Sequence, residues 1–402
     1  MVKYTTIKKN LKFEIEKGDN NDLAFLTHYL QNHENGVAPH FKDSAIKFYN
    51  ELNAQLDCVL EPEIQMVLPM DFDVPFPPPD KTEFTFIDLF AGIGGFRIPM
   101  QELNGKCVFT SEYNYYAQKS YELNFGEVPF GDITKLNLDI VPNHDILVAG
   151  FPCQPFSISG KMKGFEDTRG TLIYNVLQII EKREPKVVVL ENVKHLVHHD
   201  NGNTLKIILK HLEDLGYLIS WKVLNASDFG VPQNRERIII VGNKQKKFDF
   251  SKITEKPKMI LKPFLEKDVE FEYLNEPYTL IENFRSQESG LIFVGHRNKK
   301  IRGAGVRPGT EHLSRVHKQP NRIYSSEGLH PALPSQETSG RFWIYDEGTV
   351  RKLTINECYR LMGFPDDFIK ISNTSELYKQ IGNSVCVPMV KEVIKQVKDQ
   401  LL

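Results

Sequence analysis

Cys153 is the residue of this chain best suited to covalent chemistry, because a cysteine thiolate is a strong nucleophile. It lies in the segment GFPCQPFS (residues 150–157), directly after the apolar run 145–149. A lone cysteine is more often a small buried hydrophobic residue, so a second reactive group must decide between the two interpretations. Glu191 is that group, because it follows the apolar run 187–190 in the same way. If both runs are parallel strands, a thiolate and a proton-donating carboxyl group emerge at one edge of the sheet.

A glycine-rich segment is the second chemical feature, and it indicates a site for a nucleotide-like ligand. Residues 86–96 read FIDLFAGIGGF, which is typical of a strand that enters a tight turn and then a helix. Glycines there let the backbone approach a ligand closely. Glu112, at the end of the next apolar run, can accept hydrogen bonds from both ribose hydroxyls of an adenosine. Asp132 follows the next helical stretch, where an acid can meet the adenine amino group; tight helix–sheet packing with surface acids is the alternative.

Short apolar strands that alternate with helices must position these groups. Strands are expected at residues 84–90, 107–111, 145–149, 187–190 and 238–241. Helices are expected at residues 22–29, 45–56, 354–362 and 388–402. Unbroken apolar runs suit strands that are buried on both faces of a parallel sheet. The alternation therefore predicts a doubly wound, mostly parallel α/β fold.

Composition divides the 402-residue chain into three parts. Residues 1–80 form a helical N-terminal extension of unknown role, and the proline-rich stretch 75–79 predicts a stiff linker at its end. Residues 81–255 together with 346–402 carry the strand–helix alternation and form the catalytic domain. Between them, residues 256–345 lose periodicity and are richer in glycine and arginine, which predicts a smaller, irregular domain with no strong element.

The bulk composition is that of a soluble globular protein, with 41% hydrophobic and 25% charged residues. The five cysteines include no C-x-x-C pair, so neither a disulfide framework nor a metal site is expected. There is no apolar run of about 18 residues and no secretion signal, which favours a cytoplasmic protein. The net charge is only -2, but residues 296–322 hold eight Lys or Arg against one acid. Such a run can neutralise phosphates, although it can also be an ordinary solvated surface.

Six segments in this order resemble the motifs of the DNA cytosine-5 methyltransferases. They are the cofactor loop 86–96, the nucleophile loop 150–157, the acid motif 191–193, the basic motif QNRER at 233–237, and two closing motifs at 351–368 and 382–385. The likeness covers most of residues 84–255 and 346–392, and it is nearest to bacterial enzymes of type II restriction–modification systems. It includes the stretch 157–172, which forms the mobile catalytic loop of that family. The implied fold is the Rossmann-like class I fold of methyltransferases that use S-adenosylmethionine.

The resemblance implies transfer of a methyl group from S-adenosylmethionine to carbon 5 of a cytosine that is flipped out of double-stranded DNA. Cys153 adds to carbon 6 as a thiolate, while Glu191 supports protonation of ring nitrogen N3 and holds the exocyclic amine. Arg235 and Arg237 hold the O2 side of the ring and the geometry of Cys153 and Glu191. No metal is implied, because the sulfonium is already a good leaving group.

The resemblance also implies where the cofactor binds. Its contacts fall on Phe90, Gly92, Ile93, Gly94, Glu112, Tyr113, Asp132, Ile133, Pro152, Leu172, Asn383 and Val385. Tyr113 stands where relatives often place tryptophan against the adenine, and it keeps an aromatic surface there. The C-terminal helix is expected to pack beside the first strand.

Residues 256–345 correspond to the family's target-recognition domain. The expected DNA contacts are Gln154, Ser157, Ser159, Arg297, Arg302 and Arg315; the arginines offer forks suited to guanine edges and phosphates. Relatives often carry a Thr-Leu pair late in this domain, where this chain has Ala332-Leu333. The implied partners are double-stranded DNA and a cognate restriction endonuclease that forms no stable complex with the enzyme. The resemblance implies a monomer in the bacterial cytoplasm, bound to the nucleoid through DNA, that protects host DNA from cleavage.

Three other interpretations were weighed. An RNA cytosine-5 methyltransferase of the tRNA-modifying branch predicts a shorter variable region than residues 256–345. A DNA-binding protein with an inactive catalytic domain is disfavoured by the intact Cys153, Glu191 and Arg235. A cysteine protease is disfavoured because no histidine lies near a strand end in register with Cys153.

Overall fold

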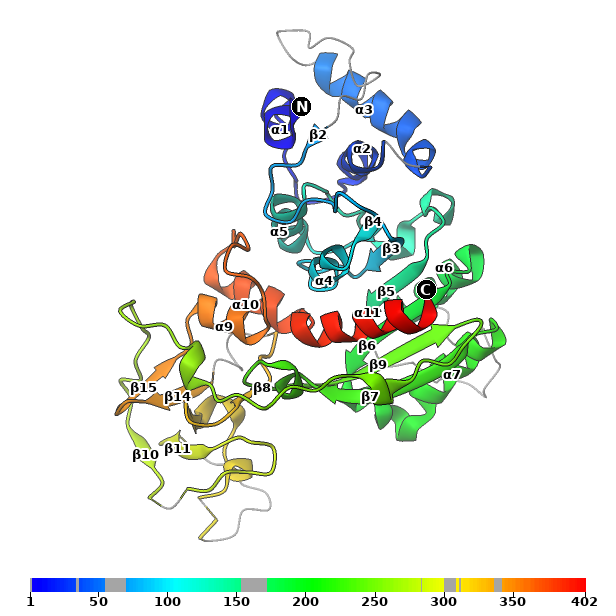
Figure 1. The fold of residues 1–402 in the computed structure, drawn as a ribbon. Coiled ribbons are helices and arrows are strands. Elements are labelled where there is room, and N and C mark those ends of the chain that lie inside the picture. The colour runs from blue at the N-terminus through cyan, green and yellow to red at the C-terminus, as the bar shows by residue number, and fades with distance from the viewer. Residues whose placement is uncertain are drawn as a thin grey trace.

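The computed structural model describes residues 2–33, 36–54, 70–152, 172–282, 284–299, 309–310, 312–335 and 342–402. Its centre is a six-stranded sheet in the order β4-β3-β5-β6-β9-β7 (Figure 1). The strands are β3 (Phe84–Leu89), β4 (Gly105–Ser111), β5 (Ile146–Gly150), β6 (Val187–Val193), β7 (Leu218–Asn225) and β9 (Glu236–Asn243). Neighbours from β4 to β6 run parallel, whereas β9 is antiparallel to both β6 and β7. The expected mostly parallel α/β fold is confirmed.

Five of these strands match the apolar runs, with bounds within three residues of those expected. The sixth strand, β7, was missed. It lies at the edge of the sheet, where Leu218 is 41% exposed and Trp221 is 42% exposed. An edge strand with an exposed face carries no unbroken apolar run, so the pattern that identified the other strands is absent.

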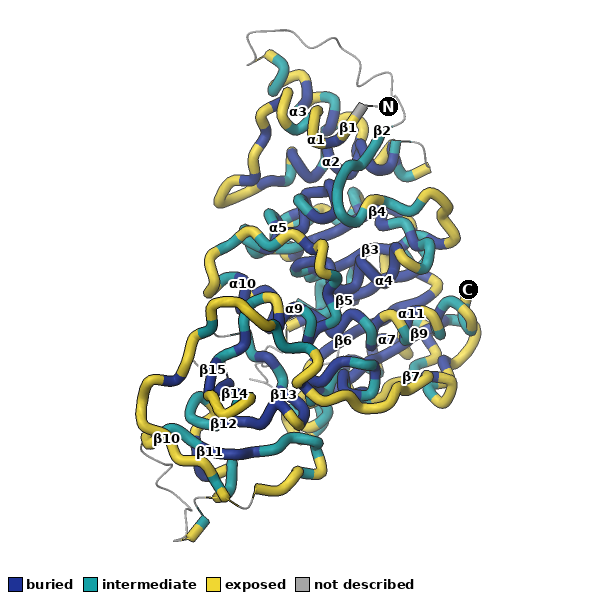
Figure 2. The backbone as a smooth tube through the Cα atoms, turned by 60° about the vertical axis from the view of Figure 1, so that its left-hand side comes forward, coloured by how far each residue is buried: buried dark blue, intermediate teal, exposed yellow. Residues whose placement is uncertain are grey.

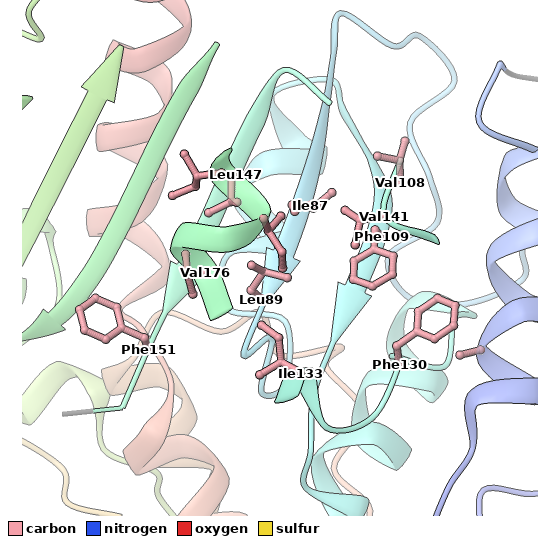
Figure 3. Packing of buried hydrophobic residues seen from close by; sticks show 14 of the residues in the cluster. Ile87, Leu89, Val108, Phe109, Phe130, Ile133, Val141, Leu147, Phe151 and Val176 are labelled. Atoms are coloured by element: carbon pink, nitrogen blue, oxygen red, sulfur yellow. The ribbon is translucent and has the colours of Figure 1, made fainter. Parts of the chain in front are cut away.

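Helices cover both faces of the sheet, as its alternating side chains require. The helices of the catalytic part are α4 (Arg97–Glu102), α5 (Tyr115–Phe125), α6 (Leu172–Arg183), α7 (Asn203–Asp214), α9 (Ile355–Leu361), α10 (Thr374–Asn383) and α11 (Val387–Leu401). In β6, Val188 belongs to the hydrophobic layer under α6 and α7, and Val189 belongs to the layer under α11. Figure 3 shows the first layer, in which Val176 of α6 packs with Leu147 of β5.

Helix α11 packs beside the first strand of the sheet, as expected. Its apolar side chains share a hydrophobic cluster with Phe84 and Phe86 of β3. Lys398 adds an ion pair to Glu83 at 2.6 Å and donates a hydrogen bond to the carbonyl of Leu103 at 3.2 Å. Figure 1 shows α11 lying across the sheet, so the end of the chain closes the layer that begins at β3.

The N-terminal segment packs against the β4 edge of the sheet. Its elements are β1 (Val2–Lys3), α1 (Tyr4–Leu11), α2 (Asn21–Asn32), α3 (Lys42–Ala54) and β2 (Met70–Asp71). The two expected helices are present as α2 and α3. The ring of Phe25 meets the ring of Phe130 edge-on at 5.0 Å, and His28 lies 4.7 Å from the same ring. One hydrophobic cluster therefore runs from α2 into the sheet, as the buried backbone in Figure 2 also shows.

The proline-rich stretch 75–79, expected as a stiff linker, is held against the catalytic part. Gln101 donates from Nε2 to the carbonyls of Phe76 and Pro77, at 3.1 and 2.8 Å. The backbone N–H of Phe76 also donates to the carbonyl of Asn124 at 2.9 Å. This stretch therefore contributes to the core packing of the protein.

A second sheet forms within residues 256–345 and just after them, so the expectation of no strong element in that region was wrong. Its order is β10-β11-β12-β14-β15, and its strands are β10 (Tyr278–Leu280), β11 (Phe293–Arg297), β12 (Arg322–Ser325), β14 (Trp343–Asp346) and β15 (Thr349–Lys352). Strands of three to five residues are too short to give a periodic signal. Two-residue strands β8 (Gln233–Asn234) and β13 (His330–Pro331) pair in parallel and connect this region to the chain just before β9. No helix in the described ranges is long and apolar enough to cross a membrane.

Candidate active site

The loops that carry the expected site residues meet at one edge of the large sheet. Strands β3 to β6 are parallel, so their carboxyl ends lie together. The glycine-rich loop follows β3, Glu112 follows β4, and Pro152 follows β5. Glu191 lies within β6, two residues before the end of that strand. Strand β3 lies between the two strands that follow it in the chain, so the strand order reverses here. Open α/β sheets bind their ligands at such a point.

The loop after β3 has a backbone that only a few residue types tolerate. Phe90 has a φ of 56°, which is uncommon for a bulky residue and is typical of binding sites. Gly92 and Gly94 also have positive φ, at 56° and 84°. A Cβ on Gly94 would lie 2.2 Å from the ring of Phe125, so glycine is required there by both conformation and space. Ile93 is buried beneath the loop and fixes it to the core.

Glu112 connects the loop after β3 with the loop after β4. Its carboxylate accepts the backbone N–H of Gly92 at 2.8 Å and that of Asn114 at 2.6 Å. Burial raises the pKa of this carboxyl group, and the two backbone donors oppose that shift. The next residue, Tyr113, is 78% exposed. An acid and an uncovered aromatic ring therefore stand side by side at the edge of the sheet.

Asp132 shapes the third loop on this side. Its Oδ1 accepts hydrogen bonds from the backbone N–H of Thr134 at 3.0 Å and from the Thr134 hydroxyl at 2.8 Å. The short helix that it caps begins with the buried Ile133. Asp132 is thus held at a partly exposed position beside the sheet.

The closing motif, at the end of α10, lies between the glycine-rich loop and the start of the nucleophile loop. Asn383 is the last residue of α10. A Cβ on Gly95 would lie 2.7 Å from Oγ of Ser384 and 2.8 Å from Cγ2 of Val385. A Cβ on Gly150 would lie 3.8 Å from Cγ1 of the same valine. Val385 therefore lies between the glycine-rich loop and the start of the nucleophile loop.

Glu191 lies directly beside the start of the nucleophile loop. It pairs with Gly150 in the parallel ladder of β5 and β6, and a Cβ on that glycine would lie 3.6 Å from Oε2 of Glu191. Nε of Arg237 lies 2.9 Å from Oε1 of Glu191. Burial raises the pKa of Glu191, whereas Arg237 and Arg235 oppose the rise. The result is a carboxyl group that keeps its proton to a higher pH than usual.

The two arginines of the basic motif have different surroundings. Arg237 contacts Glu191, whereas Arg235 is fully buried and donates to three backbone carbonyls. The acceptors are Leu333 at 2.9 Å, Gly382 at 2.9 Å and Ser384 at 2.7 Å. Burial lowers the pKa of Arg235 to about 9, and Arg237 adds to this shift. Arg235 remains charged at neutral pH and ties the closing motif to Leu333, late in residues 256–345.

Two polar residues near the site were not recognised from the sequence. Asn192 donates from Nδ2 to the carbonyl of Phe151 at 2.8 Å, which binds the nucleophile loop to β6. Asp88 is fully buried in β3, and neither carboxylate oxygen has a partner among the described residues. Burial raises its pKa well above the ordinary value. The available signal was a polar residue within an otherwise apolar strand.

Part of the expected site lies outside the described residues, namely Cys153, Gln154, Ser157, Ser159 and Arg302. On either side of that gap, Pro152 is exposed and Leu172, the first residue of α6, is half-buried. Three of the five cysteines fall in the described ranges, and all three are buried: Cys107, Cys358 and Cys386. Burial raises the pKa of Cys386 to about 11 and that of Cys107 well above its ordinary value. Neither of these two thiols is suited to nucleophilic attack near neutral pH.

The described arginines of the expected DNA interface lie in or beside the second sheet. Arg297 ends β11, pairs with Glu276 at 2.6 Å and lies 5.7 Å from the ring centre of Trp343. Arg315 lines a cavity of about 900 Å³ together with Arg285. Arg297 is therefore positioned by the sheet that the sequence did not predict, whereas Arg315 lies in a short 3-10 helix beside it.

Comparisons with known proteins agree with this geometry. Residues 84–399 match the family described as C-5 cytosine-specific DNA methylase. The chain is 41% identical to the type II methyltransferase M.HhaI of Haemophilus parahaemolyticus over 331 residues, which covers 80% of this chain and 96% of that protein. It is also 41% identical to the type II methyltransferase M.HpaII of Haemophilus parainfluenzae over 336 residues, which covers 80% of this chain and 91% of that one.

Solved structures show the same fold. The Dnmt2 methyltransferase of S. pombe has a TM-score of 0.58 at 19% identity, with 80% of this chain and 100% of that chain covered. A putative DNA modification methyltransferase from an E. coli prophage has a TM-score of 0.56 at 20% identity, with 79% and 99% covered. At these identities the likeness concerns the fold alone. The family match extends over most of the sequence, and we conclude that this chain belongs to the C-5 cytosine-specific DNA methylases, enzymes that transfer a methyl group to carbon 5 of cytosine in DNA.

Proposed function

We propose that this methyltransferase acts through a covalent adduct between the sulfur of Cys153 and carbon 6 of a cytosine that is flipped out of a specific double-stranded DNA sequence. The position of Glu191 is the observation that carries the proposal. Its carboxyl group lies against Gly150, where the nucleophile loop begins, and burial raises its pKa. This arrangement supports a proton donor beside the segment that contains the nucleophile.

The cofactor edge fits S-adenosylmethionine in three respects. Glu112 offers a carboxylate for the ribose hydroxyls, Tyr113 offers an exposed ring for the adenine, and the turn at Gly92 leaves the backbone free of side chains. When bound, S-adenosylmethionine supplies a methyl group on a sulfonium, which a carbon nucleophile can accept. We assign its contacts to Phe90, Gly92, Ile93, Gly94, Glu112, Tyr113, Asp132, Ile133, Pro152, Leu172, Asn383 and Val385.

Glu191 prepares the cytosine for attack. A raised pKa keeps more of this carboxyl group protonated near neutral pH, and the protonated form donates to ring nitrogen N3. Electron density then leaves carbon 6, which becomes open to a nucleophile. Arg237 holds the carboxyl group in place through the 2.9 Å contact between Nε and Oε1, and Arg235 holds the loops around it.

Cys153 adds to carbon 6 as a thiolate, and the electron pair of the ring double bond moves toward carbon 5. Carbon 5 would then bond to the methyl group, whose electron pair stays on the sulfonium sulfur that it leaves. Loss of the carbon 5 proton to water restores the ring double bond and breaks the bond between carbon 6 and sulfur, and the N3 proton returns to Glu191. The cysteine leaves as a thiolate, so the chain returns to its starting state.

We assign DNA recognition to residues 256–345 and to the segment after Cys153. The expected contacts are Gln154, Ser157, Ser159, Arg297, Arg302 and Arg315. The guanidinium of Arg297 is oriented by Glu276 and by the ring of Trp343. The relatives named type II methyltransferases support a role beside a restriction endonuclease that cuts the same sequence. We propose that the enzyme works as a monomer, forms no stable complex with that nuclease, and protects host DNA.

Bisulfite sequencing tests the proposed function directly. The wild-type chain and the Cys153→Ser variant are expressed in a bacterial host whose own cytosine-5 methylation has been deleted. We expect 5-methylcytosine at one recognition sequence with the wild type and none with the variant. Methylated DNA from the variant would contradict the covalent step, and methylated RNA with unmethylated DNA would favour the RNA enzyme instead.

A further inference from the structure

The N-terminal helix α2 contacts the loops that we assign to the cofactor, although it lies outside the family motifs. It packs beside β4, and its hydrophobic face joins the cluster that contains Phe109 and Phe130 (Figure 3). Asn20 and Asn21, at the start of this helix, lead to the Glu112 and Asp132 loops. Gln31, near its end, contacts α4 and the end of α5. Each contact joins segments about 66 to 110 residues apart in the sequence.

The first contact holds the loop of Asp132. Oδ1 of Asn21 accepts the backbone N–H of Gly131 at 3.0 Å, and the carbonyl of Gly131 accepts a hydrogen bond from Oγ of Ser111 at 2.9 Å. Both backbone polar groups of Gly131, the residue before Asp132, are therefore fixed. Asn21 is the first residue of α2. The beginning of that helix therefore holds the loop of Asp132 in position.

The second contact reaches the main chain of Glu112. Asn20 is buried, and its Nδ2 donates to Oε1 of Gln118 at 3.3 Å. Nε2 of Gln118 in turn donates to the carbonyl of Glu112 at 2.8 Å. The orientation of Gln118 therefore depends on a residue of the N-terminal segment.

The third contact lies beneath the glycine-rich loop. Oε1 of Gln31 accepts a hydrogen bond from Arg97 at 2.6 Å, and its Nε2 donates to the carbonyl of Phe125 at 2.5 Å. Arg97 also pairs with Glu127 at 2.6 Å, and both side chains are fully buried. The ring of Phe125 occupies the space where Gly94 would carry a side chain. Gln31 thus contacts both Arg97 and Phe125, whose ring packs against Gly94.

The charges of this network are balanced inside the protein. Burial alone would raise the pKa of Glu127, but the buried Arg97 guanidinium holds it below the ordinary value. Burial lowers the pKa of His28, so its ring is neutral near pH 7, and its Nε2 accepts the backbone N–H of Thr110 at 3.1 Å. The hydrogen bonds of this buried network favour one arrangement of the helix on the sheet.

We propose that α2 is part of the cofactor-binding apparatus and that Asn21 is a positioning residue, which holds Asp132 where it meets the adenine. This inference rests on the proposed function, since it takes the Asp132 loop as the adenine side of the site. Asn21 is the sharpest place to test it, because its side chain is only partly buried and its contact goes to the backbone of the loop itself. Removing the side chain leaves the buried Arg97–Glu127 pair intact.

The test uses the full chain and three variants. Asn21→Ala removes the acceptor, Asn21→Asp keeps it, and Thr5→Ala removes a hydrogen bond in the same N-terminal segment, from Oγ1 of Thr5 to Asp73, away from the cofactor loops. Calorimetry gives the Kd for S-adenosylhomocysteine, and hydrogen exchange reports on the peptide that contains Gly131. The KM for DNA and the unfolding temperature are measured in parallel.

We expect Asn21→Ala to raise the Kd about fivefold, the effect of one lost hydrogen bond, and to speed exchange at Gly131. Asn21→Asp should restore both values, and Thr5→Ala should change neither, with the KM for DNA equal in all four proteins. An unchanged Kd in Asn21→Ala, or an equal rise in Thr5→Ala, would overturn the inference. If Asn21→Ala does not fold, Asn21→Ser carries the same expectation. A wild-type chain that binds no S-adenosylhomocysteine would instead contradict the proposed function.

Discussion

Nε of Arg237 lies 2.9 Å from Oε1 of Glu191, across the antiparallel pair of β9 and β6. In that ladder Arg237 is opposite Val193, two residues beyond Glu191, so the two charged side chains are diagonal neighbours on one face. The contact brings a cation to a carboxyl group whose pKa burial raises. The pair therefore holds the acid in place while burial still favours its protonated form.

Replacing Glu191 with Gln should remove the proton donor and keep its shape. We expect kcat to fall by roughly 10²- to 10⁴-fold, the usual contribution of general acid catalysis. The Kd for S-adenosylmethionine should stay within about twofold, because Glu191 lies on the nucleophile side of Val385. Single-turnover methyl transfer and calorimetry measure the two quantities. A variant that loses cofactor affinity and activity together would show that Glu191 supports the fold of the site instead.

The pH profile provides an independent check on the same residue. The protonated fraction of Glu191 decreases as pH rises through its raised pKa, so activity should fall on the alkaline side. Loss of the Cys153 thiolate should lower activity on the acid side, which gives a bell-shaped profile. Glu191→Gln should lose the alkaline limb and keep the acid limb.

The two arginines of the basic motif should respond differently to the same substitution. Arg235→Lys keeps the positive charge but loses the planar guanidinium group that donates hydrogen bonds to three backbone carbonyls. We expect it to lose about 3 kcal/mol of unfolding free energy in urea denaturation. Arg237→Lys should keep the stability and lose roughly tenfold in kcat, about one hydrogen bond to a charged group. Equal losses of stability in both variants would contradict the separate roles.

Tyr113 should act through its exposed ring alone. Tyr113→Ala is expected to weaken binding of S-adenosylmethionine about fivefold, the value of one aromatic stacking contact. The unfolding temperature should not change, because the side chain is 78% exposed. Tyr113→Trp is the matched control and should bind at least as well as the wild type. An unaltered Kd in the alanine variant would remove the ring from the adenine site.

Asp88 should make stability depend on pH. Its folded-state pKa is raised by burial, so its favourable contribution is complete below the unfolded-state pKa and is lost as pH rises through the folded-state value. Asp88→Asn cannot ionise and should unfold at the same temperature as the wild type in acidic buffer. In alkaline buffer the variant should be more stable, by about 1–3 kcal/mol. Parallel melting curves at all pH values would show that Asp88 has a charged partner.

The central strands could be predicted from the sequence because buried parallel strands leave unbroken apolar runs. The same logic failed at β7, whose outer face meets water, and in the second sheet, whose strands are too short for a pattern. Glu191 could be predicted as a site residue because it follows such a run directly. The residues around Glu191 that come from distant parts of the sequence could not be predicted in this way. Arg235 meets Gly382 across 147 residues of sequence, and no local pattern records that contact.

The role of the N-terminal segment was also hidden in the sequence. Its helices were predicted, but their docking depends on Phe25, His28 and Asn21 meeting partners that lie about 100 residues away. Amphipathic helices show that a face will be buried and do not show against what. The docking of the proline-rich stretch was hidden for the same reason, because its hydrogen bonds to Gln101 come from another element.

The most direct test of the account is the adduct at Cys153. DNA that carries 5-fluorocytosine at the recognition site cannot lose its C5 substituent after methyl transfer, so the bond between sulfur and carbon 6 persists. With S-adenosylmethionine present, we predict a denaturation-resistant complex whose intact mass equals protein plus methylated DNA, and none with Cys153→Ser. Methyl transfer to ordinary DNA by Cys153→Ser, or an adduct mapped to another residue, would contradict the account.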